Sequence, residues 1–496
     1  MNSIALEQGF DFSFPGDVDA EAEELERIGI TQKDIAERRD MRNDLTFTID
    51  PADAKDFDDA LSFTTNDDGN YEVGIHIADV SHYVRPGTAL DKEAQKRTTS
   101  VYLVDRTIPM LPEALSNGLC SLREAEDKLA FSAVFTLEAK TGIVLDEWFG
   151  RTIINSNKRF TYEEAQDILD TNEGLHHHEL SELNRIAKIY SKNRFDKGAL
   201  NFETHEVRFV LDENGKPIDA KVKERIDTNK LIEEFMLLAN SRVASFVQKH
   251  NLPFFVYRIH DKPDPERAEK LKDFLKLLGY QVTMEDNIIP PKTLQRIIIE
   301  AEGTQAYETL QTVIVRSMQK AIYTTKNIGH FGLAFNEYSH FTSPIRRYPD
   351  VLAHRLVQHA LDQTAPEQDQ SWHEKMCAHC SQQEQAAVTA ERGSIKLKQV
   401  EYMADRNIHD TFDGIVTGAS KFGVFVAEEH SRSEGMIRLP DLGNDFWVYQ
   451  EKTGTVLGKK SKKTFKIGDK VKITIKKVDI ERKLIDYRLA KETKKD

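Results

Sequence analysis

The segment TIDPADAKDFDDA places five aspartates within ten residues, at positions Asp50, Asp53, Asp56, Asp58 and Asp59. Like charges this close repel one another, so the carboxylates stay ionised inside a fold only when positive charge lies among them. All-oxygen ligation selects a hard cation, and we therefore expect magnesium (Mg2+), with manganese (Mn2+) as the alternative. Two such ions can activate a water, stabilise a leaving oxygen and orient a phosphodiester for in-line attack.

A calcium loop and a solvated acidic turn are the alternative interpretations of this segment. An EF-hand needs Gly at its sixth position and Glu at its twelfth. Counted from Asp50, these positions hold Lys55 and Leu61, so the calcium loop is excluded. The solvated turn stays open on composition alone.

The segment TSPIRRY supplies two adjacent arginines, Arg346 and Arg347, just before an expected helix. Guanidinium groups bind phosphate and offset the charge of crowded carboxylates. We expect one of the two to point elsewhere, into a structural ion pair.

Two other clusters have residue types that bind metals. For His76, Asp79 and His82, strand alternation places Asp79 on the face opposite the histidines, so a three-way zinc site is not expected. The pair in CAHC, Cys377 and Cys380, lacks the second ligand pair of a structural zinc site. We expect all three cysteines of the chain to be reduced thiols.

The elements that must position these residues predict a mixed α/β body over residues 41–409, with a helical second half. An acidic lead-in, residues 1–40, precedes it with one short helix near 20–28 and is too short to form a domain alone. Apolar residues at period two predict strands, and apolar residues three or four apart predict helices. The expected strands are 46–50, 61–63 and 71–80, and the expected helices are roughly 162–170, 178–194, 229–249, 265–278, 305–323, 348–361 and 373–407.

After Arg406 the pattern changes to short strands separated by glycines, as in FDGIVTGASKFGVFVAE. Five such strands predict a small closed barrel of the OB type over residues 410–490, followed by a basic tail, 491–496. The chain carries a net charge of −14, yet residues 452–496 hold 16 Lys/Arg against 6 Asp/Glu. Lysines interleaved with β-formers predict strands with one basic face, which suits single-stranded nucleic acid. We therefore expect an α+β protein with one large domain and one small barrel.

The sequence also argues against membrane and secreted proteins. No run of apolar residues is long enough to span a bilayer, and the N-terminus MNSIALEQGFDFSFPGD has no basic region before an apolar one. Neither membrane insertion nor secretion is expected, so we expect a cytoplasmic protein.

Several segments together resemble the RNase II/RNase R family. The spacing D-x5-D-x-D-D, formed by Asp50, Asp56, Asp58 and Asp59, resembles the catalytic motif of that family. Segments similar to other family motifs follow in the family's order: GIHIADVSHYV (74–84), SVYLVDRTIPMLPEALSNGLCSL (100–122), NKLIEEFMLLAN (229–240), YRIHDKP (257–263) and HFTSPIRRYPDVLAHRL (340–356). The C-terminal barrel resembles an S1-type RNA-binding domain. The likeness covers nearly the whole chain and implies an RNB-type catalytic domain followed by an S1 barrel.

The resemblance implies processive, magnesium-dependent digestion of single-stranded RNA from a free 3′ end, releasing nucleoside 5′-monophosphates, by a monomer. The four aspartates are implied to hold the metal at the scissile phosphate. One alternative is an RNA-binding adaptor of the same fold that has lost catalysis, and the intact four-aspartate spacing argues against it. Another is a phosphodiesterase of small nucleotides, which has little need of a basic barrel.

The resemblance also implies roles for aromatic and polar residues in binding RNA. Tyr102 in SVYL and Phe202 in ALNFE match a pair that clamps the terminal nucleotides by stacking, which suits any sequence because every base has a π-face. Tyr162 in FTYEEA and Glu233 in LIEEF match groups that hydrogen-bond the 2′-hydroxyl. Core packing is the alternative for the clamp aromatics. A solvated position is the alternative for Glu233, and the neighbouring Glu234 blurs its register.

Three further matches lie near the catalytic centre. Arg346 matches an arginine at the scissile region, and Arg347 is expected either to contact RNA or to form the structural ion pair. Glu391 in TAERG matches a glutamate near the catalytic centre, with a solvated position on an Ala-rich helix as the alternative.

The chain departs from the family ahead of its catalytic motif. Family members usually carry cold-shock RNA-binding domains there, and only 49 residues precede Asp50. We therefore expect a natural short form or a truncated chain, which depends on its C-terminal barrel for RNA affinity.

Overall fold

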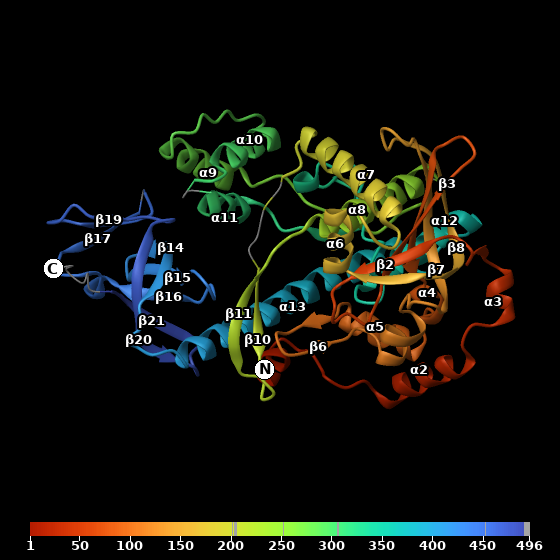
Figure 1. Ribbon diagram of the computed structural model, residues 1–496, viewed down its shortest axis with the longest axis horizontal. Coiled ribbons are helices and arrows are strands. Elements are labelled where there is room, and N and C mark those ends of the chain that lie inside the picture. The colour runs from red at the N-terminus through yellow and green to blue at the C-terminus, as the bar shows by residue number, and fades with distance from the viewer. Residues whose placement is uncertain (201, 203–205, 251, 305–306, 452, 491–496) are drawn as a thin grey trace.

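A seven-stranded sheet forms the centre of the larger of two bodies in the computed structural model (Figure 1). The structure describes residues 1–200, 202, 206–250, 252–304, 307–451 and 453–490. The strand order is β1-β8-β7-β4-β3-β2-β9, with β1/β8 and β2/β9 parallel and the other neighbours antiparallel. The strands are β1 Arg39–Met41, β2 Thr46–Asp50, β3 Asp59–Thr65, β4 Tyr71–Ala78, β7 Asp127–Leu137, β8 Val144–Asn155 and β9 Lys158–Thr161.

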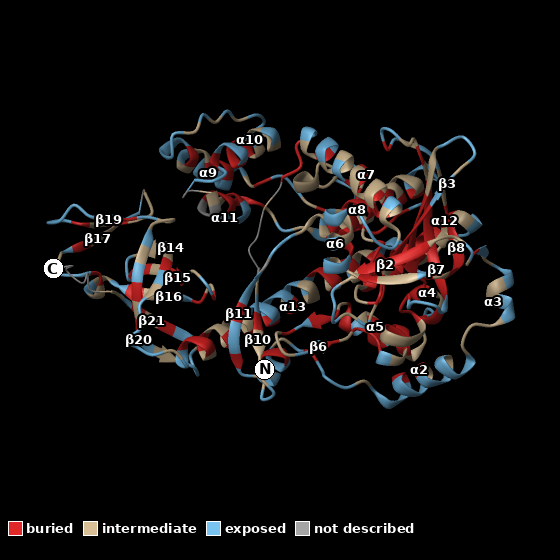
Figure 2. Cartoon of the chain, viewed as in Figure 1, coloured by how far each residue is buried: buried red, intermediate tan, exposed pale blue. Residues whose placement is uncertain are grey.

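The central strands of this sheet are buried on both faces, as Figure 2 shows. Strand β7 reads DKLAFSAVFTL, and nearly all of its residues are buried. A strand covered on both faces carries a near-continuous apolar run, because neither face contacts water. The hydroxyl of Ser132 within it is hydrogen-bonded to Thr152 and His76 on the neighbouring strands. The sheet is therefore a fully packed support for the loops at its edges.

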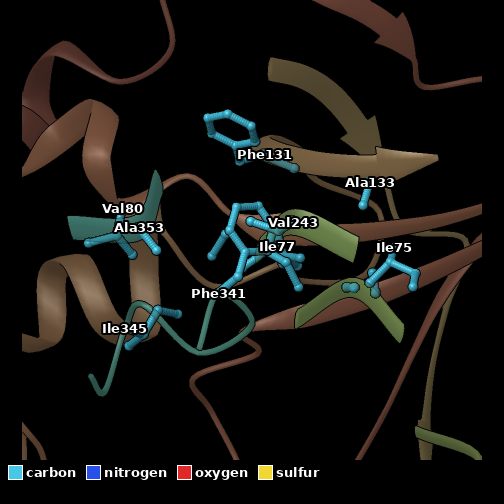
Figure 3. Packing of buried hydrophobic residues seen from close by; sticks show 14 of the residues in the cluster. Ile75, Ile77, Val80, Phe131, Ala133, Val243, Phe341, Ile345 and Ala353 are labelled. Atoms are coloured by element: carbon cyan, nitrogen blue, oxygen red, sulfur yellow. The ribbon is translucent and has the colours of Figure 1, made fainter. Parts of the chain in front are cut away.

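Helices pack around the sheet and share one large apolar core with it. They are α4 Val80–Tyr83, α5 Ala89–Arg97, α6 Tyr162–Thr171, α7 His177–Asp196, α8 Asp227–Lys249 and α12 Tyr348–Asp362. Phe341 and Ile345 enter this core from the loop that precedes α12 (Figure 3). The ring of Phe341 packs edge-to-face on Phe131 of β7, with 5.5 Å between the centroids. The core thereby fixes the segment that carries the paired arginines.

The N-terminal segment is packed onto the larger body. It contains α1 Asn2–Glu7, α2 Gly16–Ile28 and α3 Gln32–Ala36, of which α2 corresponds to the single helix expected near 20–28. Arg38 donates to the carbonyls of Ala130 and Thr152 and, at 2.7 Å, to the carboxylate of Asp79. This buried guanidinium therefore connects the end of the lead-in to β7, to β8 and to the residue that follows β4.

A lobe of three helices stands beside the larger core (Figure 1) and has its own apolar cluster. Its members are α9 Pro265–Leu277, α10 Pro291–Ala301 and α11 Tyr307–Ser317. The prediction of one helix over 305–323 was wrong at its end, because Ile322–Thr324 forms strand β13 and pairs with β12, Tyr257–Ile259. β-Branched and aromatic residues in this stretch favour the strand.

Helix α13, Gln370–Ala404, runs from the larger body to the C-terminal barrel (Figure 1). Val400 and Met403 near its end belong to the apolar cluster of the barrel. The same cluster includes Phe209 and Ala220 from a hairpin of β10, Glu206–Leu211, and β11, Pro217–Lys223. The barrel and the larger body are therefore joined by shared apolar packing as well as by the chain.

The C-terminal body is a closed five-stranded barrel in the order β14-β15-β16-β21-β20, which confirms the expected OB-type architecture. Its strands are β14 Phe412–Ser420, β15 Gly423–Glu428, β16 Glu434–Arg438, β20 Lys470–Asp479 and β21 Leu484–Leu489. A three-stranded sheet follows η3 Leu439–Leu442 and contains β17 Trp447–Gln450, β18 Thr455–Gly458 and β19 Thr464–Phe465. The remaining elements are β5 Val101–Tyr102, β6 Thr107–Ile108, the π-helix η1 Ala114–Leu119 and the 3-10 helix η2 Phe331–Leu333.

The other expected helices are confirmed as α6, α7, α8, α9, α12 and α13, with ends that differ by a few residues, and the three expected strands as β2, β3 and β4. The long strands β7 and β8 have no counterpart among the expected ones. β7 lacks period-two alternation because both of its faces are buried. The three cysteines are free thiols, as expected, and all three are buried. Within the described ranges, no helix is long and apolar enough to cross a bilayer.

Candidate active site

Four aspartates gather where β2 ends and β3 begins. Asp50 is the last residue of β2, and Asp59 is the first residue of β3. These strands are antiparallel neighbours, so both residues lie at the same edge of the sheet. Asp56 and Asp58 belong to the segment between them, residues 51–58, which we call the aspartate loop. The fold thus brings together the four residues of the D-x5-D-x-D-D motif.

Burial raises the pKa of all four carboxyl groups. The pKa of Asp50 and that of Asp58 rise to about 7, and the pKa of Asp56 is raised as well. The pKa of Asp59 rises well above its ordinary value, first through burial and then through the charges of Asp50 and Asp58. Oδ2 of Asp50 is buried and accepts no hydrogen bond from the described residues. Protein groups alone therefore do not stabilise four ionised carboxylates here.

Asp58 is held by the loop that precedes α12. Its Oδ1 accepts a hydrogen bond from the backbone N–H of Ile345 at 2.9 Å, and its Oδ2 lies 3.5 Å from Nε of Arg346. The side chain of Arg346 is 43% exposed, whereas that of Asp58 is 7% exposed. Arg346 therefore extends from a buried carboxylate toward solvent, where it can meet an incoming phosphate.

The second arginine forms the structural ion pair. Nε and Nη2 of Arg347 donate to the two carboxylate oxygens of Asp350, at 3.0 and 2.7 Å. The same carboxylate accepts from the backbone N–H of Ser343, at 2.8 Å. The guanidinium of Arg347 is thus already engaged in holding the loop, which favours the structural role over the RNA contact.

Tyr102 lies beside Arg346. The backbone N–H of Ser100 donates to the carbonyl of Arg346 at 3.0 Å, so the two segments run together. Burial raises the pKa of the Tyr102 hydroxyl, and the charges of Arg346, Asp56 and Asp58 also act on it. Tyr102 is nevertheless 40% exposed. A half-exposed ring next to the acidic centre fits a stacking surface better than a core position.

Tyr162 is the first residue of α6 and is close enough to Asp59 and Asp50 for their charges to act on it. Burial raises the pKa of its hydroxyl, and the charges of Asp59 and Asp50 raise it further. Its hydroxyl also interacts with the side chain of Asn229 on α8. Glu233 follows Asn229 by four residues and therefore lies on the same face of that helix.

The neighbouring glutamates of α8 have different environments. Glu234 is buried and pairs with Arg194 at 2.5 Å. The side chain of Glu233 is 36% exposed, pairs with Arg225 and lies 3.9 Å from Arg194. The structure thus leaves Glu233, and not Glu234, open to a ligand, although its carboxylate is paired with arginine in the protein alone.

Two further expected site residues have different surroundings. Phe202 is half-buried and packs against the apolar cluster of α9, α10 and α11, which matches the core alternative, and its stacking on RNA stays a prediction. Glu391 is exposed on α13, beside Ala390, which packs against Val101 next to Tyr102. Its catalytic role also stays a prediction.

The alternative zinc triad does not form. His76 is buried between the hydroxyls of Ser132 and Ser62, at 2.7 and 2.9 Å, and burial lowers its pKa to about 3. Asp79 pairs with two arginines, and His82 belongs to helix α4 and lies 3.4 Å from Asp34. Each of the three is therefore engaged with different partners.

The aspartate cluster fits a hard divalent cation in its chemistry. Its donors are carboxylate oxygens, their pKa values are raised by burial and mutual repulsion, and one oxygen lacks any partner among the described residues. Within the described ranges, however, no group of three or more His, Cys, Asp or Glu side chains is arranged so that it could hold one metal ion. The carboxylates would therefore have to turn toward a cation as it binds.

Sequence reasoning missed the groups that fix the aspartate loop. The hydroxyl of Ser121 donates to the carbonyl of Lys55 at 2.7 Å and accepts from the backbone N–H of Phe57 at 3.0 Å. Nη2 of Arg159 donates to the carbonyls of Pro51 and Ala52. These contacts join distant segments, and no local spacing indicates them.

The chain is similar to known proteins over both of its bodies. Residues 38–363 match the model of the family described as "RNB domain", and residues 405–488 match that of the family described as "S1 RNA binding domain". The chain is 40% identical over 491 residues to ribonuclease R of Thermotoga maritima, covering 97% of this chain and 68% of that protein. It is 39% identical to ribonuclease R 1 of Lactococcus lactis, covering 94% of this chain and 58% of that protein.

The fold is also similar to a solved structure, that of Mycoplasma genitalium RNase R in complex with ribose methylated single-stranded RNA. The TM-score is 0.91 at 25% sequence identity, with 99% of this chain and 77% of that chain covered. The similarity therefore extends through both bodies of the chain.

Proposed function

The chain belongs to the RNB-domain family that includes ribonuclease R, and on that premise we propose that it hydrolyses single-stranded RNA from the 3′ end to nucleoside 5′-monophosphates. One observation carries the proposal: Asp58 is fixed between Ile345 and Arg346 at the edge where the four motif aspartates meet. The charges of these aspartates act on the hydroxyls of both Tyr102 and Tyr162. An acidic metal site, a cation for phosphate and aromatic surfaces are the groups that phosphodiester hydrolysis on single strands needs.

The residues of this chain divide the work by position. Tyr102 offers a ring on which a terminal base can stack, and Tyr162 and Glu233 face the ribose, where a 2′-hydroxyl distinguishes RNA from DNA. Arg346 donates to a nonbridging phosphate oxygen and offsets its charge. Water attacks phosphorus, the P–O3′ bond breaks, and O3′ takes a proton and becomes the new 3′ end.

Magnesium is our proposal for the cofactor, held by Asp50, Asp56, Asp58 and Asp59, with manganese as a substitute. When bound, such ions lower the pKa of the attacking water and stabilise the leaving oxygen. Asp58 is oriented for this purpose by Ile345 and Arg346 before any ligand arrives. We also propose a monomer that acts in the cytoplasm.

A cavity between the two bodies supports a single-stranded substrate. It is lined by residues of the α10–α11 region, including Arg316, and by barrel residues, including Thr417, His430 and Lys470. A strand that passes between them would have its phosphates near basic groups of both bodies. Continuous contact along the strand is the basis on which we propose processive digestion.

The test uses one 20-nucleotide RNA labelled at either end, with magnesium or with EDTA. We expect a 3′ label to appear in mononucleotide at the earliest times and a 5′ label in short final products, both with magnesium only. Intact RNA under both conditions, with binding retained, would establish the RNA-binding adaptor instead. Faster cleavage of a dinucleotide than of the 20-mer would establish a phosphodiesterase of small nucleotides.

A further inference from the structure

We propose that Arg159 is a positioning residue that holds the aspartate loop in the shape needed to bind the catalytic cation, an inference that rests on the function proposed above. Arg159 lies on β9, the parallel neighbour of β2, in register with Thr48. Asp50 is in register with Thr161 on the same strand. The guanidinium therefore projects from the sheet edge at which the metal-binding aspartates are placed.

The guanidinium of Arg159 contacts the loop at both of its ends. Nη2 donates to the carbonyl of Pro51 at 2.6 Å and to that of Ala52 at 3.1 Å. Cζ lies 5.5 Å from the ring centroid of Phe57, which is buried. A rigid planar cation can make both contacts at once, and a lysine ammonium cannot stack in this way.

The same side chain acts on the first metal-binding residue. The positive charge of Arg159 acts on both Asp50 and Asp53. Nε of Arg159 and Oδ2 of Asp50 are both buried, and neither has a hydrogen-bond partner among the described residues. Arg159 thus adds positive charge next to a carboxylate whose free oxygen remains available for a cation.

The second half of the loop has its own anchor. Ser121 bonds to Lys55 and Phe57, and the backbone N–H of Leu122 donates to the carbonyl of Phe57 at 3.0 Å. The first half has Arg159 and an ion pair of Arg208 with Asp53, whose side chains are 68% and 61% exposed. Solvent screens such an exposed pair, so Arg159 is the stronger restraint on the first half.

This arrangement predicts a specific effect on metal binding. Asp50 precedes the loop, and Asp56 and Asp58 end it, so the separation of these carboxylates depends on the shape of the loop. Removal of a residue that orients the metal ligands without binding the metal itself typically weakens metal affinity about 10-fold to 100-fold. Loss of Arg159 should therefore weaken cation binding more than it weakens RNA binding.

The experiment compares Arg159→Met with Lys158→Met in the full chain. The control removes a positive charge from the same strand, but among the described residues the side chain of Lys158 pairs with Glu124 and lies over the ring of Phe160, with no contact to the loop. Magnesium is titrated in two assays: hydrolysis of a labelled 20-nucleotide RNA, and the rise in melting temperature without RNA. Affinity for the same RNA is measured in EDTA.

We expect Arg159→Met to raise the half-saturating magnesium concentration about 10-fold in both assays, with RNA affinity in EDTA within about twofold of wild type. Lys158→Met should match wild type in all three measurements. A lower melting temperature with unchanged magnesium curves would show a merely structural role and overturn the proposal. Weaker RNA binding with unchanged magnesium curves would overturn it too, in favour of an RNA contact.

Arg159→Lys keeps the inference testable if Arg159→Met does not fold. This variant retains the charge and a hydrogen-bond donor but loses the planar contact with Phe57. We therefore expect a smaller shift of the magnesium curves in the same direction. Magnesium curves identical to those of wild type would contradict the proposal. If the wild-type chain shows a magnesium-dependent melting temperature but no hydrolysis, the proposed function fails, while the thermal titration still decides the role of Arg159.

Discussion

The carboxylate of Asp58 accepts a hydrogen bond from the backbone N–H of Ile345, which lies 287 residues further along the chain. Ile345 is itself buried in the main core, so the donor has a fixed position. Arg346 follows directly and reaches Oδ2 of the same carboxylate. The acidic and basic halves of the candidate site are thus coupled through one buried side chain.

Asp58→Asn should remove cleavage and preserve RNA binding. The change keeps the size of the side chain and deletes the charge at the centre of the acidic cluster, so we expect the cleavage rate to fall by about 1,000-fold or more. Asp53→Asn is the matched control, because Asp53 is exposed and pairs with Arg208 at the surface. Single-turnover rates and RNA affinity in EDTA measure the two effects. Equal rates for the two variants would remove Asp58 from the catalytic centre.

Arg346→Met should mainly lower the cleavage rate, whereas Arg347→Met should mainly lower the stability of the fold. Arg346 is half-exposed, so its loss should lower the cleavage rate by about 100-fold and the free energy of unfolding by less than about 1 kcal/mol. Arg347 pairs with the buried Asp350, and breaking a buried pair costs roughly 3–5 kcal/mol. Denaturant titration and initial rates separate them. A stable Arg347→Met variant with lost RNA affinity would restore Arg347 as an RNA contact.

Tyr162→Phe and Glu233→Gln should each reduce the preference for RNA over DNA. Loss of one hydrogen bond to a 2′-hydroxyl is worth about 1 kcal/mol, or roughly fivefold. The measurement is the ratio of kcat/KM for RNA and DNA strands of the same sequence. Tyr190→Phe is the control, because its hydroxyl donates to the carbonyl of Gly142 in a different part of the fold. An unchanged ratio in both site variants contradicts the ribose assignment.

Asp79 should make the stability of the fold depend on acid pH. Burial would raise its pKa, but Arg151 and Arg38 outweigh burial and hold the pKa below its ordinary value. The folded chain therefore releases this proton more readily than the unfolded chain, so the stabilisation is complete above about pH 5 and is lost as the pH falls below it. We expect Asp79→Asn to cost roughly 3–5 kcal/mol at pH 7. The difference in the free energy of unfolding between wild type and Asp79→Asn, measured by urea titration, should be smaller at pH 3.5 than at pH 7. A difference that does not change with pH would contradict this account.

The barrel should contribute to RNA affinity through Phe422 and Lys421. Phe422 is 66% exposed, and Nζ of Lys421 lies 5.1 Å from its ring centroid. Phe422→Ala should weaken binding by about 1–3 kcal/mol through lost stacking, and Lys421→Gln should reduce the salt dependence by about one ion. Leu484→Ala, another exposed apolar position of the barrel, serves as control. Normal affinity and salt dependence in both variants would show that RNA does not contact this loop.

Deleting the whole barrel is a poorer test of the same idea. Val400 and Met403 of α13 pack in the apolar cluster of the barrel, and Phe209 of the hairpin joins them. Removal of residues 411–496 would expose these side chains to water and destabilise the larger body. Point substitutions on the surface of the barrel avoid this effect.

The sequence by itself determined the features that depend on near neighbours. The spacing from Asp50 to Asp59 was enough to predict an acidic site, since side chains around one turn of chain between two strands must lie close together. Helical periodicity predicted most of the α-helices, strand alternation predicted β2, β3 and β4, and the change after Arg406 predicted the barrel. Periodicity gave the wrong prediction for β13, which was expected to be helical. This strand forms because β12, more than sixty residues earlier in the chain, pairs with it.

Only the tertiary structure decided between neighbours of the same type. Arg346 and Arg347 are of the same type, as are Glu233 and Glu234, and their environments differ because Arg347 pairs with the buried Asp350 and the buried Glu234 pairs with Arg194. The contact of Ile345 with Asp58 and the support of the aspartate loop by Arg159 have the same origin. The physical reason is that burial and hydrogen-bond partners are set by packing between distant segments, which local spacing does not encode.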